Sequence, residues 1–128
     1  ARTADLDLTP SAHWPEPALV FEPEPPDGPV LVLTRYRVEP HNEDEFFAAM
    51  ARLGRSRQRS GASQWRLFRN IEKDNTFVEA FVVRSWGEHL HQHHTRLTGQ
   101  DLIIEQAVER YIDGPPVSQH LIAVNPEG

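Results

Sequence analysis

The segment Thr76–Trp86 most constrains the fold, because it reads as a β-strand with apolar side chains on both faces. At a period of two, the two faces carry Phe77, Phe81 and Val83 on one side, and Val78, Ala80, Val82 and Trp86 on the other. Such a strand needs cover on both sides. Helices of the same chain can cover one face. We therefore expect a second copy of the chain to cover the other face, in a two-fold homodimer.

Hydrophobic periodicity predicts the remaining elements. Capping-box patterns at Asn42 and Ser85, each followed three residues later by a glutamate, predict the starts of two helices. The predicted elements are strands at 30–38, 62–70, 76–86 and 117–124, and helices beginning near Asn42, Ser85 and Asp101. The third helix is expected to bury Ile103, Ile104, Ala107, Val108 and Tyr111. The order β-α-β-β-α-α-β predicts an α+β, ferredoxin-like fold, a four-stranded antiparallel sheet with helices on one face.

Residues 1–29 differ in composition from the rest of the chain. They hold seven of the 11 prolines, and six acidic residues against one arginine. We therefore predict an acidic, proline-rich arm at 1–29, a globular domain at 30–124 and a tail at 125–128. Part of the arm is expected to pack on the body through Trp14 and Phe21, although a tail ordered only by chance contacts is an equal alternative.

Charge and composition exclude several classes of function. The formal net charge of −6, with a nearly neutral globular part, argues against a nucleic-acid-binding protein. Without cysteine, disulfides, thiolate metal sites and cysteine nucleophiles are excluded. No stretch approaches the roughly 20 apolar residues that cross a bilayer, so the chain as given is expected to be soluble. It begins at Ala1 rather than at methionine, which is typical of a piece of a longer protein.

A histidine-rich helix is the most conspicuous candidate for chemistry. His89 and His93 are four residues apart, a spacing that can hold a transition metal, but the sequence supplies no third ligand. We therefore predict neither a metal nor a cofactor. His93 or His94 is the candidate general base, and the alternative is a polar helix surface with one histidine bonded in the core.

Other polar and aromatic residues leave alternatives open. Glu79, inside the apolar strand, is expected to pair with an arginine such as Arg66 or Arg69, or else to be an acid with a shifted pKa. The arginines at the end of the first helix are expected to be solvated, with an anion site as the alternative: Arg52, Arg55, Arg57 and Arg59. A pocket for a small aromatic ligand is predicted from aromatic side chains, with plain core as the alternative: Tyr36, Trp65, Phe81 and Trp86, together with His93.

Four stretches carry a resemblance to a known family: 7–17 in the arm, 28–32 together with Tyr36, 85–93 and 117–123. Together they resemble the C-terminal region of major-facilitator transporters of the transmembrane secretion effector type, relatives of the enterobactin exporter. The globular part is similar to the antibiotic biosynthesis monooxygenase group, which forms dimeric α+β barrels. The resemblance implies that the arm follows the last membrane helix. It also implies a domain at the cytoplasmic face of the membrane, with the membrane-embedded transporter as its partner.

The sequence departs from the family in three places. Arg35 stands where many relatives are acidic, and His91 and His94 stand where relatives often have arginine or glutamate. Haem-degrading members of the wider group use an asparagine on the first strand, and residues 34–37 contain none. The resemblance therefore does not imply a haem site.

Two functions follow as hypotheses. The first is a non-catalytic accessory domain of an exporter, which dimerises and binds a small ligand. The second is a cofactor-free monooxygenase acting on phenolic or polyketide-like substrates, with His93 or His94 as the base.

Overall fold

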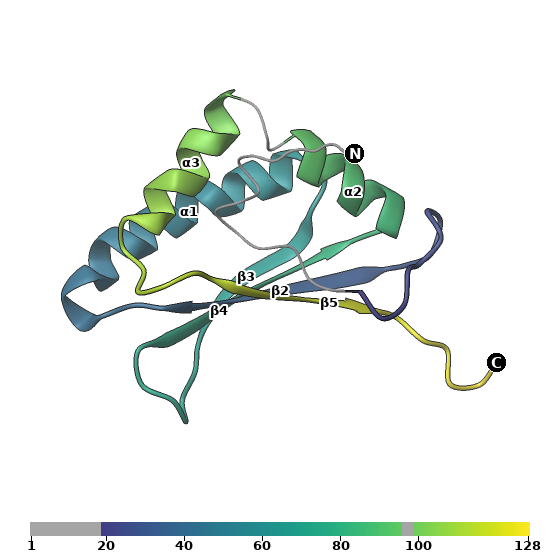
Figure 1. Cartoon of the computed structure of the whole chain (residues 1–128), viewed down its shortest axis with the longest axis horizontal. Coiled ribbons are helices and arrows are strands. Elements are labelled where there is room, and N and C mark those ends of the chain that lie inside the picture. Colours follow the sequence, from purple (N-terminus) through teal and green to yellow (C-terminus); the bar gives the residue numbers. More distant parts are fainter. Residues whose placement is uncertain (1–18, 96–98) are drawn as a thin grey trace.

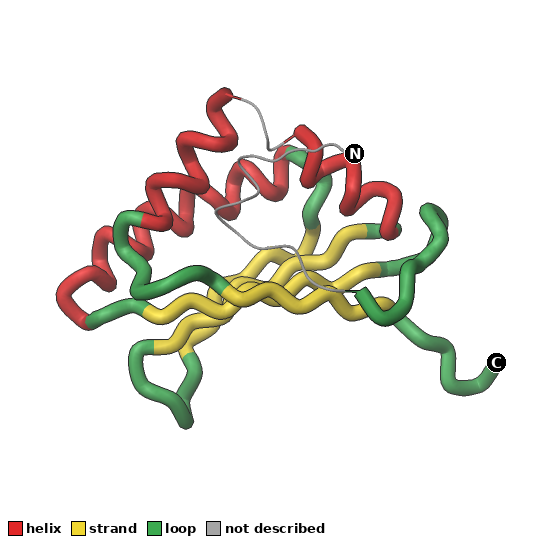
Figure 2. The backbone as a smooth tube through the Cα atoms, in the orientation of Figure 1, coloured by secondary structure: helices red, strands yellow, loops and turns green. Residues whose placement is uncertain are grey.

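The computed structural model describes residues 19–95 and 99–128. Its strands form one antiparallel sheet in the order β3-β4-β2-β5, and the three α-helices lie on one face of it (Figures 1 and 2). The elements are β2 (Val30–Arg37), a 3₁₀ turn η2 (Pro40–Asn42), α1 (Glu43–Arg59), β3 (Ser63–Arg69), β4 (Thr76–Val83), α2 (Trp86–Thr95), α3 (Gly99–Glu109) and β5 (Val117–Ile122). The predicted α+β, ferredoxin-like fold is confirmed.

The central strands β2 and β4 set the register of the sheet. They pair antiparallel from Val30 opposite Val83 to Arg37 opposite Thr76. Along β2, the residues facing the helices are buried and alternate with partly or fully exposed ones. The sheet is therefore two-sided, with a covered inner face and an outer face on which the described residues place no helix.

The inner face and the helices enclose two adjoining apolar clusters. One is centred on Tyr36, Phe46 and Phe77, and the other on Phe81 and Trp86. From α3, Ile104 and Val108 enter the core, whereas Ile103 is 55% exposed. The prediction that Ile103 is buried was wrong, because successive helical positions are rotated by about 100° and only one of these two isoleucines can point inward.

The two predicted capping boxes behave differently. Ser85 accepts a hydrogen bond from the Glu88 N–H at 3.1 Å, at the start of α2. Asn42 makes no side-chain cap, because it ends the η2 turn with helical backbone angles already in place. A capping side chain normally extends from a residue with β-region angles.

Trp86 lies on the opposite side of the sheet from its prediction. The strand β4 ends at Val83, and the chain turns so that Trp86 is the first residue of α2. Its ring then packs with Phe81 and Val83 in the inner cluster. The prediction continued the alternation of faces along β4 as far as Trp86. The strand ends earlier, and after the turn the side-chain direction no longer follows that alternation.

The end of the predicted arm is bonded to the body. The carbonyls of Pro25 and Asp27 accept hydrogen bonds from the Gly87 and Trp86 N–H groups at 2.8 and 2.7 Å. Phe21 is 61% exposed, although its other side lines a small pocket beside β5. The predicted contact of Trp14 lies outside the described residues. No described helix is long and apolar enough to cross a membrane.

Candidate functional site

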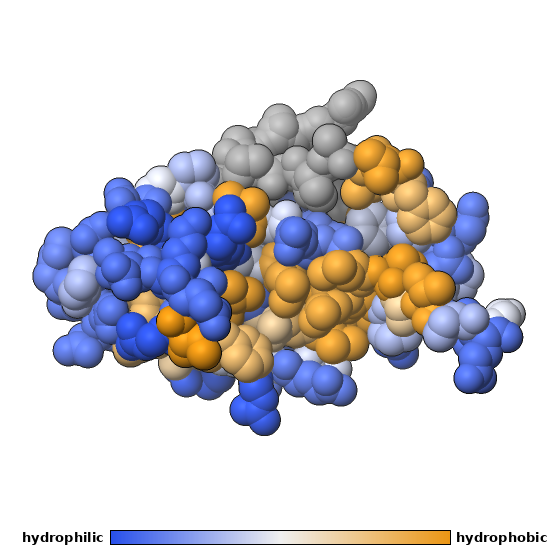
Figure 3. All heavy atoms as spheres, turned by 90° about the horizontal axis from the view of Figure 1, so that it is seen from below, coloured by the Kyte–Doolittle hydropathy of each residue, from blue (hydrophilic) through white to orange (hydrophobic). Residues whose placement is uncertain are grey.

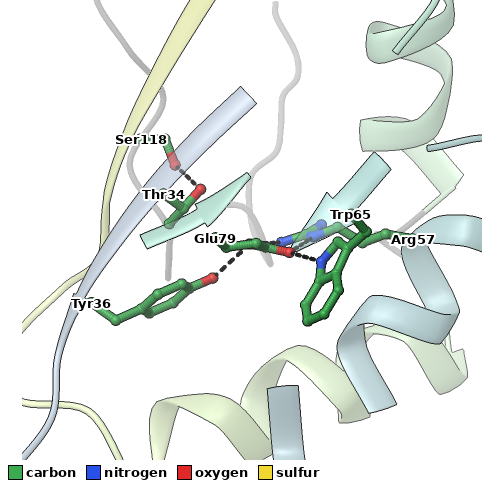
Figure 4. A network of polar contacts seen from close by, with 6 residues as sticks. All are labelled: Thr34, Tyr36, Arg57, Trp65, Glu79 and Ser118. Carbon is green, nitrogen blue, oxygen red and sulfur yellow. Dashed lines mark hydrogen bonds and ion pairs between the residues drawn. The ribbon is translucent and has the colours of Figure 1, made fainter. Parts of the chain in front are cut away.

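A carboxylate on the inner face of the sheet organises a buried polar network. Glu79 on β4 is fully buried and lies between the sheet and α1 (Figure 4). It accepts a hydrogen bond from the Tyr36 hydroxyl at 3.0 Å and one from the Trp65 indole Nε1–H at 2.8 Å. Arg57 donates two more, from Nε to Oε2 and from Nη2 to Oε1, the latter at 3.2 Å.

These four hydrogen bonds fill the carboxylate, which accepts about four. Burial, followed by the neighbouring Glu79 carboxylate, raises the pKa of Tyr36 well above its usual value. Burial acts to lower the pKa of Arg57, but the attraction of Glu79 outweighs it and raises that pKa above its usual value. Arg57 is therefore a permanent cation, Tyr36 stays neutral, and no lone pair of Glu79 is left to take a proton from a substrate.

The position of Arg57 corrects two expectations. It is buried rather than solvated at the helix end, and it pairs with Glu79 in place of Arg66 or Arg69. Its guanidinium lies 5.0 Å from the centre of the Phe81 ring, a favourable cation–π geometry. Arg57 falls on the inward side of α1 with Leu53 and Met50, whereas Arg66 is exposed on the outer face.

A glycine on α1 allows Trp65 to reach this network. A Cβ atom at Gly54 would lie 2.8 Å from the Trp65 ring. Without a side chain there, the indole packs closely against the helix and its N–H reaches Glu79. Any larger residue at this position has to push the ring away from the carboxylate.

A second polar cluster joins the start of α2 to β5. The Trp86 and His89 rings stack at 5.2 Å, and His120 contacts the edge of both, at 6.1 Å from Trp86 and 4.7 Å from His89. His89 is 6% exposed, and Gln92, one turn further along α2, is also buried. Trp86, His89 and Gln92 thus form the inward face of the histidine-rich helix, and His120 faces them from β5.

Two hollows lie near these clusters. A partly open pocket of about 60 Å³ is lined by arm residues, by Trp86 and by the β2–β5 edge of the sheet. A wider, shallow groove of about 670 Å³ lies on the outer face beside β3, lined by side chains that include Leu31, Phe68 and Val82. The first is smaller than the roughly 300 Å³ of ordinary small-molecule sites, and the second is open to solvent.

The family comparison covers nearly the entire chain. Residues 1–127 match the family described as transmembrane secretion effector. The chain belongs to this family. No curated protein matches the sequence of this secretion-effector chain.

Solved structures share the fold of the secretion-effector domain. A Caulobacter crescentus protein classed with antibiotic biosynthesis monooxygenases is 19% identical, with a TM-score of 0.67 over 79% of this chain and 94% of that one. A similarly classed Nitrosomonas europaea protein is 14% identical, with a TM-score of 0.64 over 86% and 100%. The cofactor-independent oxygenase SnoaB of Streptomyces nogalater is 19% identical, with a TM-score of 0.64 over 77% and 95%. At these identities the likeness establishes the fold alone.

The predicted pocket residues of the secretion-effector domain divide between the two clusters. Tyr36 and Trp65 meet at Glu79, with Phe81 beneath Arg57. Trp86 belongs to the histidine cluster, and His93 on α2 is half-buried. The predicted residue His94 is also on α2, but its side chain lies outside the description.

Sequence reasoning considered His89 only as a metal ligand beside His93, and it missed His120. His89 follows Trp86 by three residues, so helical spacing from that tryptophan would have placed it inward. His120 lies on the inner face of β5 together with Ser118 and Ile122. Its contact with His89 joins elements that are far apart in the sequence, and no local signal announces it. Among the described residues, no three histidine or acidic side chains gather in a geometry that holds a metal ion.

Proposed function

We propose that this domain is a non-catalytic accessory module of a major-facilitator exporter, at the cytoplasmic face of the membrane, and that it dimerises through the outer face of its sheet. The transmembrane secretion effector family supports the link to an exporter. The observation that carries the proposal is the apolar outer face of the sheet.

The apolar side chains of that face run across β4, β2 and β5. One row runs from Val82 through Leu31 to Leu121, and the next pairs Leu33 with Ala80. Phe68 on β3 and Val117 on β5 extend the surface at its two edges, and both are about half exposed. In Figure 3 apolar side chains fill the middle of this face. A contiguous surface of this kind is typical of a protein interface.

The charges on this face are compatible with dimerisation. Arg35 and Arg66 point outward from β2 and β3, and both are exposed. Their long stems can cover apolar surface while the guanidinium groups reach the solvated rim of an interface. A second copy of the sheet, related by a two-fold axis, presents the same apolar rows to Leu31 and Leu33.

The filled Glu79 carboxylate supports the absence of catalysis. A general base needs a free lone pair within reach of the substrate proton. Both oxygens of Glu79 are already bonded, and Arg57 and Tyr36 are held in single protonation states. The role of this buried network is structural, because its hydrogen bonds connect α1, β2, β3 and β4.

Sedimentation of an outer-face variant tests the dimer. We expect the wild-type chain to sediment as a dimer at micromolar concentration. Leu31→Glu, which buries a charge in the interface, is expected to weaken the dimer at least about a hundredfold. The matched control is Ile71→Glu, because Ile71 is 87% exposed in the β3–β4 turn. A monomeric wild-type chain, or equal behaviour of both variants, contradicts the proposal.

Deletion in the parent transporter tests the accessory role. A transporter that lacks residues 30–124 should be present in the membrane in lower amount, or it should transport its substrate more slowly. Leu31→Glu in the intact transporter should reproduce part of that loss, and Ile71→Glu should not. Normal assembly and transport after the deletion count against the role.

A cofactor-free monooxygenase is the second candidate. The fold shared with SnoaB favours it, together with the half-buried candidate base His93 on α2. Oxygen uptake with an anthrone-type substrate, lost when His93 and His94 are both changed to alanine, would support it. An undiminished rate in the double variant, or the absence of uptake by the wild-type chain, would reject it.

A further inference from the structure

We propose that the groove beside β3 binds an aromatic anion, and that the bound anion prevents a second copy of the chain from covering the outer face of the sheet. The groove has a volume of about 670 Å³, which lies within the range of small-molecule sites. This inference rests on the proposed function, since it names a ligand class and a form of regulation for the surface through which the domain dimerises.

The floor of the groove is apolar and accessible. Four side chains from three neighbouring strands line it: Leu31, Phe68, Ala80 and Val82. Leu31 and Phe68 are 37% and 50% exposed, so both can contact a molecule that enters from solvent. Apolar surface that a ring covers is removed from water, which stabilises the complex. The floor therefore favours a flat, apolar ring system.

Arg66 supplies the charge of the groove. Its side chain is exposed beside the apolar floor. It makes no ion pair with a described residue, whereas Arg69 on the same strand pairs with Glu43. A guanidinium group carries several N–H donors in one plane, and it binds carboxylates, phosphates and similar oxyanions through paired hydrogen bonds. A ring that carries one anionic group matches both the floor and the arginine.

The surrounding face has no acidic side chain that would repel such an anion. The residues of the described strands that point outward include Arg35 and Arg66 but no aspartate or glutamate. Glu79, the one acidic residue of these strands, points inward to Arg57. A second copy brings further arginines to this face and no carboxylate, whereas an anion neutralises Arg66. Charge complementarity therefore favours the anion at the groove.

The strand β3 is irregular where it borders the groove. Its pairing with β4 shifts between Ser63 and Arg66, so that β3 carries one extra residue. Within this bulge, Gln64 has a φ of 53°, in the left-handed region that residues other than glycine seldom adopt. Bulges are frequent beside binding sites, where they redirect side chains. Here Gln64 lines the groove together with Gln58, and the two amides provide further donors for an oxyanion.

The anion and the second copy need the same side chains. Leu31 and Val82 line the groove, and they also belong to the apolar row that the dimer covers. The same atoms cannot be covered twice, so each of the two binding events weakens the other. An aromatic anion therefore shifts the domain from dimer to monomer.

Fluorescence titration of the chain tests the site with anilinonaphthalene sulfonate, an aromatic anion that emits strongly in apolar surroundings. The control probe is phenylnaphthylamine, which has the same rings without the sulfonate group. We expect Arg66→Gln to weaken binding of the sulfonate about fivefold and to leave binding of the neutral probe unchanged. Phe68→Ala, which removes part of the floor, should weaken both probes.

The matched control for the charge is Arg84→Gln. The Arg84 side chain is 85% exposed and lies outside the groove, so its loss should change the affinity for neither probe. Sulfonate binding that responds equally to Arg66→Gln and Arg84→Gln overturns the proposal. Sulfonate binding that neither Arg66→Gln nor Phe68→Ala weakens places the probe elsewhere and overturns it as well.

Sedimentation with and without the sulfonate tests the exclusion of the second copy. At a probe concentration about ten times its dissociation constant, the wild-type dimer should weaken about a hundredfold, because each of the two copies has to release its anion. A dimer that is unchanged or strengthened by saturating probe overturns the proposal. A wild-type chain that is monomeric without any probe refutes the dimer of the proposed function and with it the exclusion. The two failures are distinguishable, because the second is seen in the absence of the probe.

Discussion

At the scale of single residues, the charges of Glu79 and Arg57 depend on each other. Both side chains are almost completely removed from water. The transfer of either charge into the protein interior is costly on its own, and their attraction offsets that cost only while both are present. Tyr36 and Trp65 complete the arrangement by donating to the same carboxylate.

Removal of one partner of this pair should therefore be more harmful than removal of both. Glu79→Gln is expected to lower the free energy of unfolding by about 3–5 kcal/mol, because Arg57 is left as a buried, uncompensated cation. The double variant Glu79→Gln, Arg57→Met should be more stable than Glu79→Gln alone. Urea unfolding of the single and double variants measures this coupling. Purely additive losses would contradict it.

The raised pKa of Tyr36 predicts a loss of stability at alkaline pH. Its folded-state pKa lies above the usual value of about 10, so the folded chain binds a proton that the unfolded chain releases first. The contribution is complete below pH 10 and declines as pH rises from there toward the folded-state pKa. Tyr36→Phe should flatten this part of the stability curve. Unfolding measured between pH 8 and pH 11 checks it, and equal slopes in both proteins would disprove it.

Residue identities alone pointed to an arginine partner for Glu79 but not to the right one. Arg66 and Arg69 are closer in sequence, on the strand that pairs with β4. Arg66 points to the outer face, and Arg69 pairs with Glu43 at 3.1 Å. Arg57 is 22 residues from Glu79, and only the packing of α1 against the sheet brings them together.

At the scale of elements, α2 depends on the arm for its N-terminal hydrogen bonds. The first N–H groups of a helix have no partner within the helix. Here Trp86 and Gly87 donate to arm carbonyls, and Glu88 donates to the Ser85 hydroxyl. Gly28 allows this contact, because a Cβ there would lie 2.3 Å from the Arg84 carbonyl oxygen. The end of the arm is thus part of the fold.

Loss of the Ser85 cap should destabilise α2 measurably. Ser85→Ala removes the acceptor of the Glu88 N–H and should lower the free energy of unfolding by about 1 kcal/mol. Ser63→Ala is the control, since its hydroxyl makes only a 3.4 Å contact with the Val82 carbonyl near the surface. Chemical denaturation compares the two, and an equal effect would show that the cap contributes nothing.

The two capping boxes also show what a local motif predicts. Ser85 and Asn42 carry the same four-residue pattern, and only Ser85 forms the cap. The difference lies in the preceding residues, since Pro40 starts a 3₁₀ turn that carries helical geometry through Asn42. The motif residues predict where a helix starts. The backbone conformation before the helix decides whether the first side chain of the motif forms the capping hydrogen bond.

At the scale of the whole molecule, the sheet has one face covered by its own helices and one face that the described chain leaves open (Figures 1 and 3). Leu31 and Phe68 are 37% and 50% exposed on that open face. A second copy that covers these side chains links folding to protein concentration.

The melting temperature should therefore rise with concentration. For a dimer of this size, a tenfold increase in protein concentration is expected to raise Tm by about 3 °C. Leu31→Glu should remove the dependence, and Ile71→Glu should retain it. Calorimetry at three concentrations provides the measurement. A constant Tm for the wild-type chain would rule out folding linked to dimerisation.

The sequence by itself determined the order of elements, the fold class and the two apolar faces of β4, because period-two and period-3.6 patterns are local properties. Only the tertiary structure decided that Arg57 bonds Glu79, that Trp86 faces inward, and that His89 meets His120. Each of these contacts joins residues on different elements, or follows a turn that resets side-chain direction. They depend on how the helices and the sheet pack together, which no short stretch of sequence specifies.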